Sequence, residues 1–187
     1  MQSRWMVRVS GAFAVLALLF AVGSPLVMAQ NADSPEINKL LADAKDHAVL
    51  AENDADTLSS YTNSKLSWET HAHRLEMIKT HVNNLGKVVA DLKDKRAEGS
   101  AWQQEAIDRI DPLLNDMAEN LTATINHLND NRAKVHMPPY RDYAKANYEL
   151  AARTTAVISD LVEYGKAKAK SESLEQKLEL PASGSGE

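Results

Sequence analysis

Apolar residues recur at alternating steps of three and four along most of the chain, which is the spacing of one face of an α-helix. No stretch sustains the two-residue alternation of a half-buried β-strand. Proline, glycine and serine divide this pattern into four long segments. The pattern therefore predicts an all-α protein with four helices.

The first segment begins at Ser34-Pro35, where a capping serine precedes a proline at the first helical position. It is predicted to end near Thr62, and the second to run over residues 64–96. The predicted core face of the first is Ile37, Leu41, Ala44, Ala48, Ala51, Ala55 and Leu58, and that of the second is Trp68, His71, Leu75, Ile78, Val82, Leu85, Val89 and Leu92.

The third segment starts directly after Ser100, which is spaced from Gln103 as in a capping box. Pro112 lies inside this segment and is expected to kink the helix near Asp108, because proline removes a backbone donor. The predicted core face is Ile107, Ile110, Leu114, Met117, Leu121, Thr124 and Leu128.

Pro138-Pro139 opens the fourth segment, which is predicted to run to about Lys170. Its predicted core face is Tyr140, Tyr143, Asn147, Leu150, Thr154, Val157, Leu161 and Tyr164. Residues 171–187 are expected to form a helical extension and then a disordered tail.

Four helices joined by short turns favour an antiparallel up-down-up-down four-helix bundle over residues 30–170. A three-helix coiled coil and an extended dimer are the alternatives.

Residues 1–29 have the parts of a secretory signal peptide. Arg4 and Arg8 precede an uncharged apolar run from Val9 to Val22, and small residues lead to a cleavage site after Ala29. The run is shorter than the roughly 20 residues that span a bilayer, so a retained membrane anchor is the weaker interpretation. We expect a periplasmic or secreted protein with no stable membrane anchor after cleavage.

The charge and composition of the chain limit the classes of partner that it can bind. Residues 1–29 hold two of the 21 basic residues and none of the 26 acidic ones, so the remaining chain carries a net charge of −7. That balance argues against a nucleic-acid partner. The chain has no cysteine, so the fold must depend on packing. A solvated acidic face is expected on the first helix, comprising Asp43, Asp46, Glu52, Asp54 and Asp56.

Motifs for catalysis are absent from the sequence. It has no Gly-x-Ser-x-Gly elbow, no glycine-rich phosphate loop, no Cys-x-x-Cys-His and no Glu-x-x-His pair. We therefore expect a non-enzymatic protein with no catalytic residues and no cofactor.

The histidines are the best candidates for an alternative function, in which the protein binds a metal ion or haem. His73, Met77 and His81 share one helix face, and imidazole with thioether suits copper or a non-covalent haem. A solvated flank is the competing interpretation. A periplasmic metal- or haem-binding bundle is therefore kept as the alternative function.

His71 and Asn147 both interrupt apolar faces. Counting back from the predicted turns places them at one height, which predicts a buried hydrogen bond between them. A polar layer that binds a ligand is the alternative.

The same counting gathers an aromatic cluster at the end of the bundle formed by the first and third turns. Its members are Tyr61, Trp68, Tyr140 and Tyr143, with His136 and Met137 beside them. An ordinary bundle end capped by rings with wet tips is the simpler interpretation. Tyrosine and tryptophan give large contact areas with a polar group, so this end is also the best candidate for a small pocket or a partner-binding tip. The functional hypothesis is an exported protein that acts by binding a protein partner or by self-association.

Overall fold

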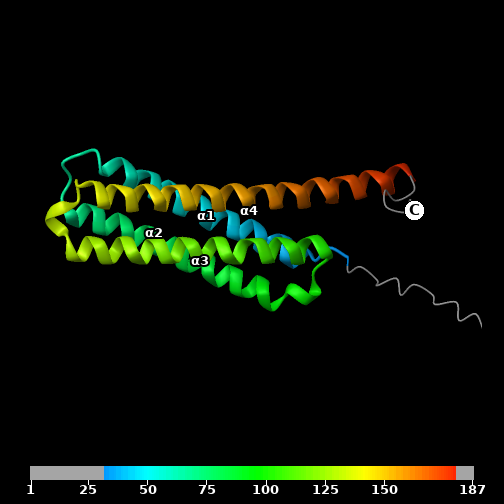
Figure 1. Cartoon of the computed structure of the whole chain (residues 1–187). Coiled ribbons are helices and arrows are strands. Elements are labelled where there is room, and N and C mark those ends of the chain that lie inside the picture. Colours follow the sequence, from blue (N-terminus) through cyan, green and yellow to red (C-terminus); the bar gives the residue numbers. More distant parts are fainter. Residues whose placement is uncertain (1–31, 180–187) are drawn as a thin grey trace, which may run out of the picture.

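The computed structural model describes residues 32–179, which form four long helices and no strand (Figure 1). The helices are α1 (Pro35–Tyr61), α2 (Trp68–Asp94), α3 (Ala101–Asp130) and α4 (Pro138–Leu178). Short 3-10 turns, η1 (Arg96–Glu98) and η2 (Arg132–Lys134), lie in two of the connections. The predicted all-α class is confirmed for this part of the chain. The predicted signal peptide and the tail from residue 180 onward lie outside the described residues.

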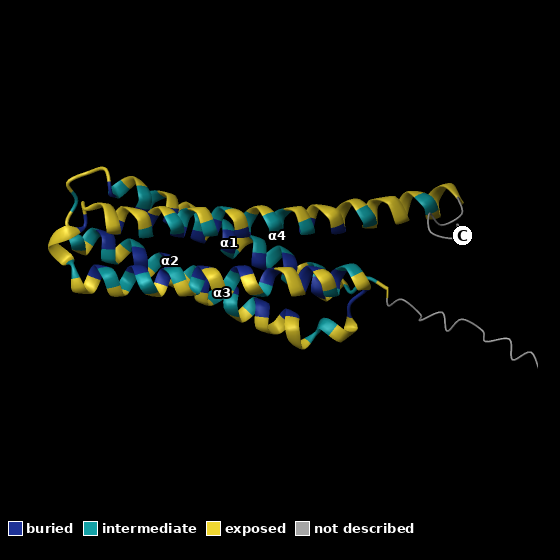
Figure 2. Ribbon diagram, in the orientation of Figure 1, coloured by how far each residue is buried: buried dark blue, intermediate teal, exposed yellow. Residues whose placement is uncertain are grey.

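Each helix packs against two others: α1 and α3 both contact α2 and α4. The connections after α1 and after α3 lie at one end of the molecule, and the α2–α3 connection lies toward the other end (Figure 1). Two clusters of buried apolar side chains fill the interior. Buried and exposed positions alternate along the helices, as one-sided packing requires (Figure 2).

The helix starts follow from local sequence. Ser34 Oγ accepts a hydrogen bond from the backbone amide of Ile37 at 3.4 Å. Gln103 Oε1 accepts from the backbone amide of Ser100 at 3.1 Å, as the capping-box spacing predicts. Pro112 does not end α3, which continues from Ala101 to Asp130.

The predicted core faces of α1 and α2 are confirmed, with Trp68 partly buried. That of α4 is wrong over much of its length. The buried positions of α4 are Tyr140, Ala144, Asn147, Ala151, Thr154, Ile158, Val162 and Gly165, so the true line passes one residue beside the predicted one at most steps. Alanines on that line pack into the same cluster as Ala51 and Ala55 of α1, and small side chains let two helices approach closely.

The base of the molecule, opposite the turns after α1 and α3, is held by a side chain from α3. Gln103 is fully buried, and its Nε2 donates to the Ser34 carbonyl and to Asn38 Oδ1, each at 2.9 Å. Its Oε1 also accepts from the Ser34 amide at 2.9 Å. This one side chain therefore joins the first turns of α1 and α3.

Asp33 extends the same contact to α4. Its carboxylate accepts from Trp102 Nε1 at 2.8 Å and from Lys168 Nζ at 3.1 Å. Burial alone would raise the pKa of Asp33, but hydrogen bonds from Ser100, Lys168 and Trp102 outweigh it and hold the pKa below its usual range.

The fourth helix reaches Leu178, eight residues beyond its predicted end near Lys170. Its C-terminal part projects beyond the other three helices (Figure 1). Within residues 32–179, none of the helices combines the length and apolar character needed to cross a membrane.

Candidate functional site

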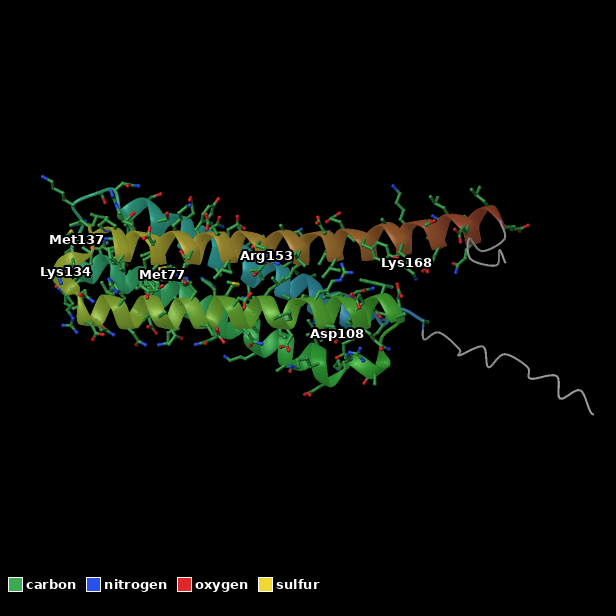
Figure 3. The ribbon with its side chains drawn as sticks, in the orientation of Figure 1. Met77, Asp108, Lys134, Met137, Arg153 and Lys168 are labelled. Atoms are coloured by element: carbon green, nitrogen blue, oxygen red, sulfur yellow. The ribbon has the colours of Figure 1, made fainter. Side chains whose placement is uncertain are left out.

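We call the tip the end of the molecule at which residues 62–67 and 131–137 lie. The guanidinium of Arg132 lies over the ring of Trp68, 4.3 Å from its centroid. Because Trp68 is the first residue of α2 after one connection and Arg132 lies in the other, the contact shows that the two turns are neighbours. Figure 3 shows Met137 at this end of the molecule.

His71 lies at the centre of the tip and is fully buried. Its ring meets those of Tyr140, Tyr61 and His136 edge to face, with centroid distances of 5.2, 5.8 and 6.4 Å. Neither ring nitrogen has a hydrogen-bond partner among the described residues. The edge-to-face contacts are favourable, but two buried polar atoms remain unsatisfied.

Tyr140 continues the cluster on α4. Its side chain is buried, its hydroxyl has no partner within residues 32–179, and burial raises its pKa. His127 of α3 stacks on Tyr140 at 6.3 Å and contacts the ring of Tyr143 at 5.1 Å. Three members of the predicted aromatic cluster, Tyr61, Tyr140 and Tyr143, therefore lie in one set of neighbouring rings, joined by His71 and by His127, which the sequence did not single out. The fourth, Trp68, contacts Arg132 instead.

Burial lowers the pKa of His71, and the nearby His136 lowers it further. The free imidazole has a pKa near 6.5, so His71 is neutral at pH 7. A protonated His71 would place a charge in a buried position where burial and His136 both oppose it and where no acidic side chain among the described residues pairs with it.

Acid should therefore destabilise the tip through His71. Below about pH 6.5 the unfolded chain binds a proton at this histidine and the folded chain resists it, so stability falls as the pH falls. Urea unfolding at about pH 7.5 and pH 5 should show a larger loss for the wild type than for His71→Phe. His73→Phe, at an exposed histidine of the same helix, should lose as much as the wild type. Equal losses in all three proteins would contradict the prediction.

Asn147 does not bond to His71, so that prediction is wrong. Its Nδ2 donates to Thr124 Oγ1 at 2.6 Å and to the Tyr143 carbonyl at 3.0 Å. The predicted heights of the two residues along the bundle are wrong because the connections at residues 62–67 and 131–137 contain more residues than a tight turn. His71 is in the first turn of α2 and therefore meets Tyr140, in the first turn of α4.

A double-mutant cycle should show this change of partner. Thr124→Val and Asn147→Leu should be coupled by at least about 0.5 kcal/mol in urea unfolding, since the two side chains share a buried hydrogen bond. His71→Leu and Asn147→Leu should be additive within about 0.5 kcal/mol. Coupling between the His71 and Asn147 changes, with additive effects of the Thr124 and Asn147 changes, would support the contact predicted from the sequence instead.

The three candidate metal ligands of α2 have different surroundings. His73 is exposed, Met77 is half-buried, and His81 Nε2 lies 3.4 Å from Asp54 Oδ2. Within residues 32–179, no three histidine or acidic side chains are grouped so as to hold a metal ion. The helix face that they share is thus divided between solvent and a contact with Asp54 of α1.

Asp54 belongs to a polar network between α1 and α2 and not to the solvated face that its acidic neighbours predict. It is buried and accepts a hydrogen bond from Arg74 Nη1. Arg74 Nη2 donates to the hydroxyl of Tyr61 at 3.2 Å. The network therefore connects the aromatic rings of the tip to the interface between the first two helices.

A groove of about 440 Å³ runs between α1 and α4 beside the tip. Charged residues of both signs line it, among them Asp56, Arg141, Lys145 and Glu149. Arg141 also donates to Asn63 Oδ1 at 3.2 Å, which joins the groove to residues 62–67.

The two connections at the tip differ in charge from the rest of the chain. They carry Lys65, Arg132, Lys134 and His136, and residues 62–67 and 131–137 include no aspartate or glutamate. The tip thus combines aromatic rings with local positive charge on an acidic protein.

Comparison with known proteins gives no match to a family model, to a curated protein or to a solved structure.

Proposed function

We propose that this is an exported, non-enzymatic protein, folded as an antiparallel up-down-up-down four-helix bundle, that binds a protein partner through the tip. The observation that carries the proposal is the pairing of Arg132 with the half-buried Trp68 on a surface whose connections hold only basic charge. Aromatic and arginine side chains supply most of the energy in protein interfaces.

The local charge favours an acidic segment of the partner. Residues 62–67 and 131–137 contribute three lysine or arginine side chains and no acid, and such a patch speeds encounter with an oppositely charged surface. Nucleic acid is disfavoured as the partner because the rest of the chain is acidic and would repel it. Met137, which is 53 % exposed, adds an adaptable apolar contact.

The tip can be tested by placing a photo-crosslinking amino acid at position 137 and, as a control, at position 50. Both native side chains are exposed, at 53 % and 44 %, but Leu50 lies on α1 away from the turns. Irradiation in the native envelope should give a defined adduct only from position 137. The double change Arg132→Glu and Lys134→Glu should abolish that adduct. Identical adducts from both positions, or none from position 137, would overturn the proposal.

Export can be tested separately. If residues 1–29 are a signal peptide, intact-mass measurement of the protein from its native envelope should give a chain that begins at Gln30, with or without cyclisation of that glutamine. Recovery of a chain that begins at Met1 in a membrane fraction would support the retained anchor instead.

A further inference from the structure

The C-terminal part of α4 presents a mainly apolar line on its surface. The line is Tyr164, Ala167, the polar Ser171, Leu174 and Leu178, and its members are exposed, with Leu174 at 47 % and Leu178 at 63 %. Tyr164 also meets the ring of Trp102 of α3 edge to face, with centroids 5.1 Å apart. From Tyr164 the line runs toward the C-terminal end of α4, which projects beyond the other helices (Figure 1).

The spacing of this line is that of a coiled-coil seam. Its members follow steps of three, four, three and four, which average 3.5 residues. That period keeps a seam facing one partner helix, whereas a solvated helix has no need of it. The line therefore indicates a helix-to-helix contact along the axis of α4.

The projecting part of α4 also has few packing contacts within residues 32–179. Residues 169–178 are exposed apart from Glu175, whereas most helical stability in proteins comes from tertiary packing of one face. Ion pairs such as Lys168–Glu172 support it, but each such pair contributes only about 0.3–0.5 kcal/mol. A partner helix on the apolar line would supply the missing packing.

The distribution of charge along this part of α4 favours a second copy of the same helix in the antiparallel direction. Residues 166–170 carry three lysines and no acid, whereas residues 172–179 carry three glutamates and a single lysine, Lys177. A second copy in the antiparallel direction places the basic half of each helix beside the acidic half of the other. A parallel copy would place like charges together.

We propose that two copies of this protein associate through antiparallel pairing of the C-terminal part of α4, with Leu174 and Leu178 at the contact. The proposal stands apart from the function of the tip. The dimer would nevertheless determine where the tips lie, because the tip is at the opposite end of α4 from the proposed contact. The pair would present its two tips at its two far ends, so it would be a bivalent rod.

Sedimentation velocity of the purified protein over a concentration series tests the pairing. The contact is small, so association is expected in the range of about 10–200 µM and not at nanomolar concentration. The wild type should shift from monomer to dimer across the series. Leu174→Glu with Leu178→Glu should remain monomeric, whereas Leu50→Glu, at an exposed leucine of α1, should dimerise like the wild type. A wild type that stays monomeric, or a Leu50→Glu variant that loses the dimer equally, would overturn the proposal.

A charge exchange tests the direction of pairing. Lys166→Glu with Lys170→Glu makes both halves acidic, and Glu172→Lys with Glu179→Lys makes both halves basic. Each variant alone should be monomeric, and an equimolar mixture should recover the dimer. Circular dichroism of each variant checks that the helices persist. If the separate variants dimerise as well as the wild type, or the mixture stays monomeric, the antiparallel pairing is wrong.

Discussion

Replacing Arg74 with methionine should lower the free energy of unfolding by about 3 kcal/mol, near the lower end of the range for breaking a buried ion pair. The change leaves the carboxylate of Asp54 without its cation, at a position where only 10 % of the aspartate side chain reaches solvent. It also removes the hydrogen bond to the Tyr61 hydroxyl. The Arg74 side chain keeps 21 % exposure, which places the expected loss at the lower end.

Two further variants test whether the loss of stability comes from the uncompensated charge of Asp54 or from lost packing of the arginine side chain. Asp54→Leu combined with Arg74→Met removes both charges and should recover much of the loss, because apolar replacements of a buried pair are often neutral. Arg109→Met breaks the pair with Glu105, where both side chains are about 60 % exposed, and should cost less than about 0.5 kcal/mol. Urea unfolding measures all three, and a loss for Arg74→Met no larger than for Arg109→Met would show that the network adds little.

The helices that the sequence predicts well are those whose apolar faces have no competing line. In α1 the line from Ile37 to Leu58 keeps its phase, whereas apolar residues off that line, such as Leu50, form no second continuous line, and Ala44, Ala48, Ala51 and Ala55 are all buried. In α2 the seven predicted positions from His71 to Leu92 are buried for the same reason. Capping serines and prolines then placed the starts of α1, α3 and α4.

The predicted face of α4 is wrong because apolar residues occupy two adjacent lines of this helix. Leu150 is larger than Ala151, yet Ala151 is buried in the same cluster as Ala51 and Ala55 of α1, and Leu150 lies at the edge of that cluster. Small side chains let two helices approach closely, so at this step the smaller residue is the buried one. Periodicity alone cannot choose between adjacent lines on a helix that has apolar residues on both.

The sequence predicts which aromatic residues gather at the tip but not which of their side chains are in contact. Counting residues from the turns brings Tyr61, Tyr140 and Tyr143 to one end, and that grouping depends only on helix length. Which side chains touch depends on a few residues in each connection, so the partner of His71 was missed. Asp54 was missed because a carboxylate in an acidic run gives no sign that Arg74 of another helix lies beside it.

Gln103→Leu should destabilise the protein by about 3 kcal/mol, since it removes a buried side chain that makes several hydrogen bonds and leaves their partners unpaired at about 1–3 kcal/mol each. The partners are the amide and carbonyl of Ser34, the amide of Ser100 and Asn38 Oδ1. The two amides are among the backbone donors that helix starts leave without intrahelical acceptors, so no other group within the first turn replaces the glutamine.

Gln103→Glu sharpens the test. The carboxylate keeps the shape and the acceptor oxygen but loses the two donations from Nε2, and it brings a charge into a fully buried position. It should therefore be at least as destabilising as Gln103→Leu at neutral pH and should regain stability in acid, as the carboxylate takes up a proton. Gln176→Leu, at an exposed position of α4, should change stability by less than about 0.5 kcal/mol. If Gln103→Leu unfolds at the same urea concentration as Gln176→Leu, the hydrogen bonds at the base contribute nothing net, and the first turns of α1 and α3 are held by apolar packing alone.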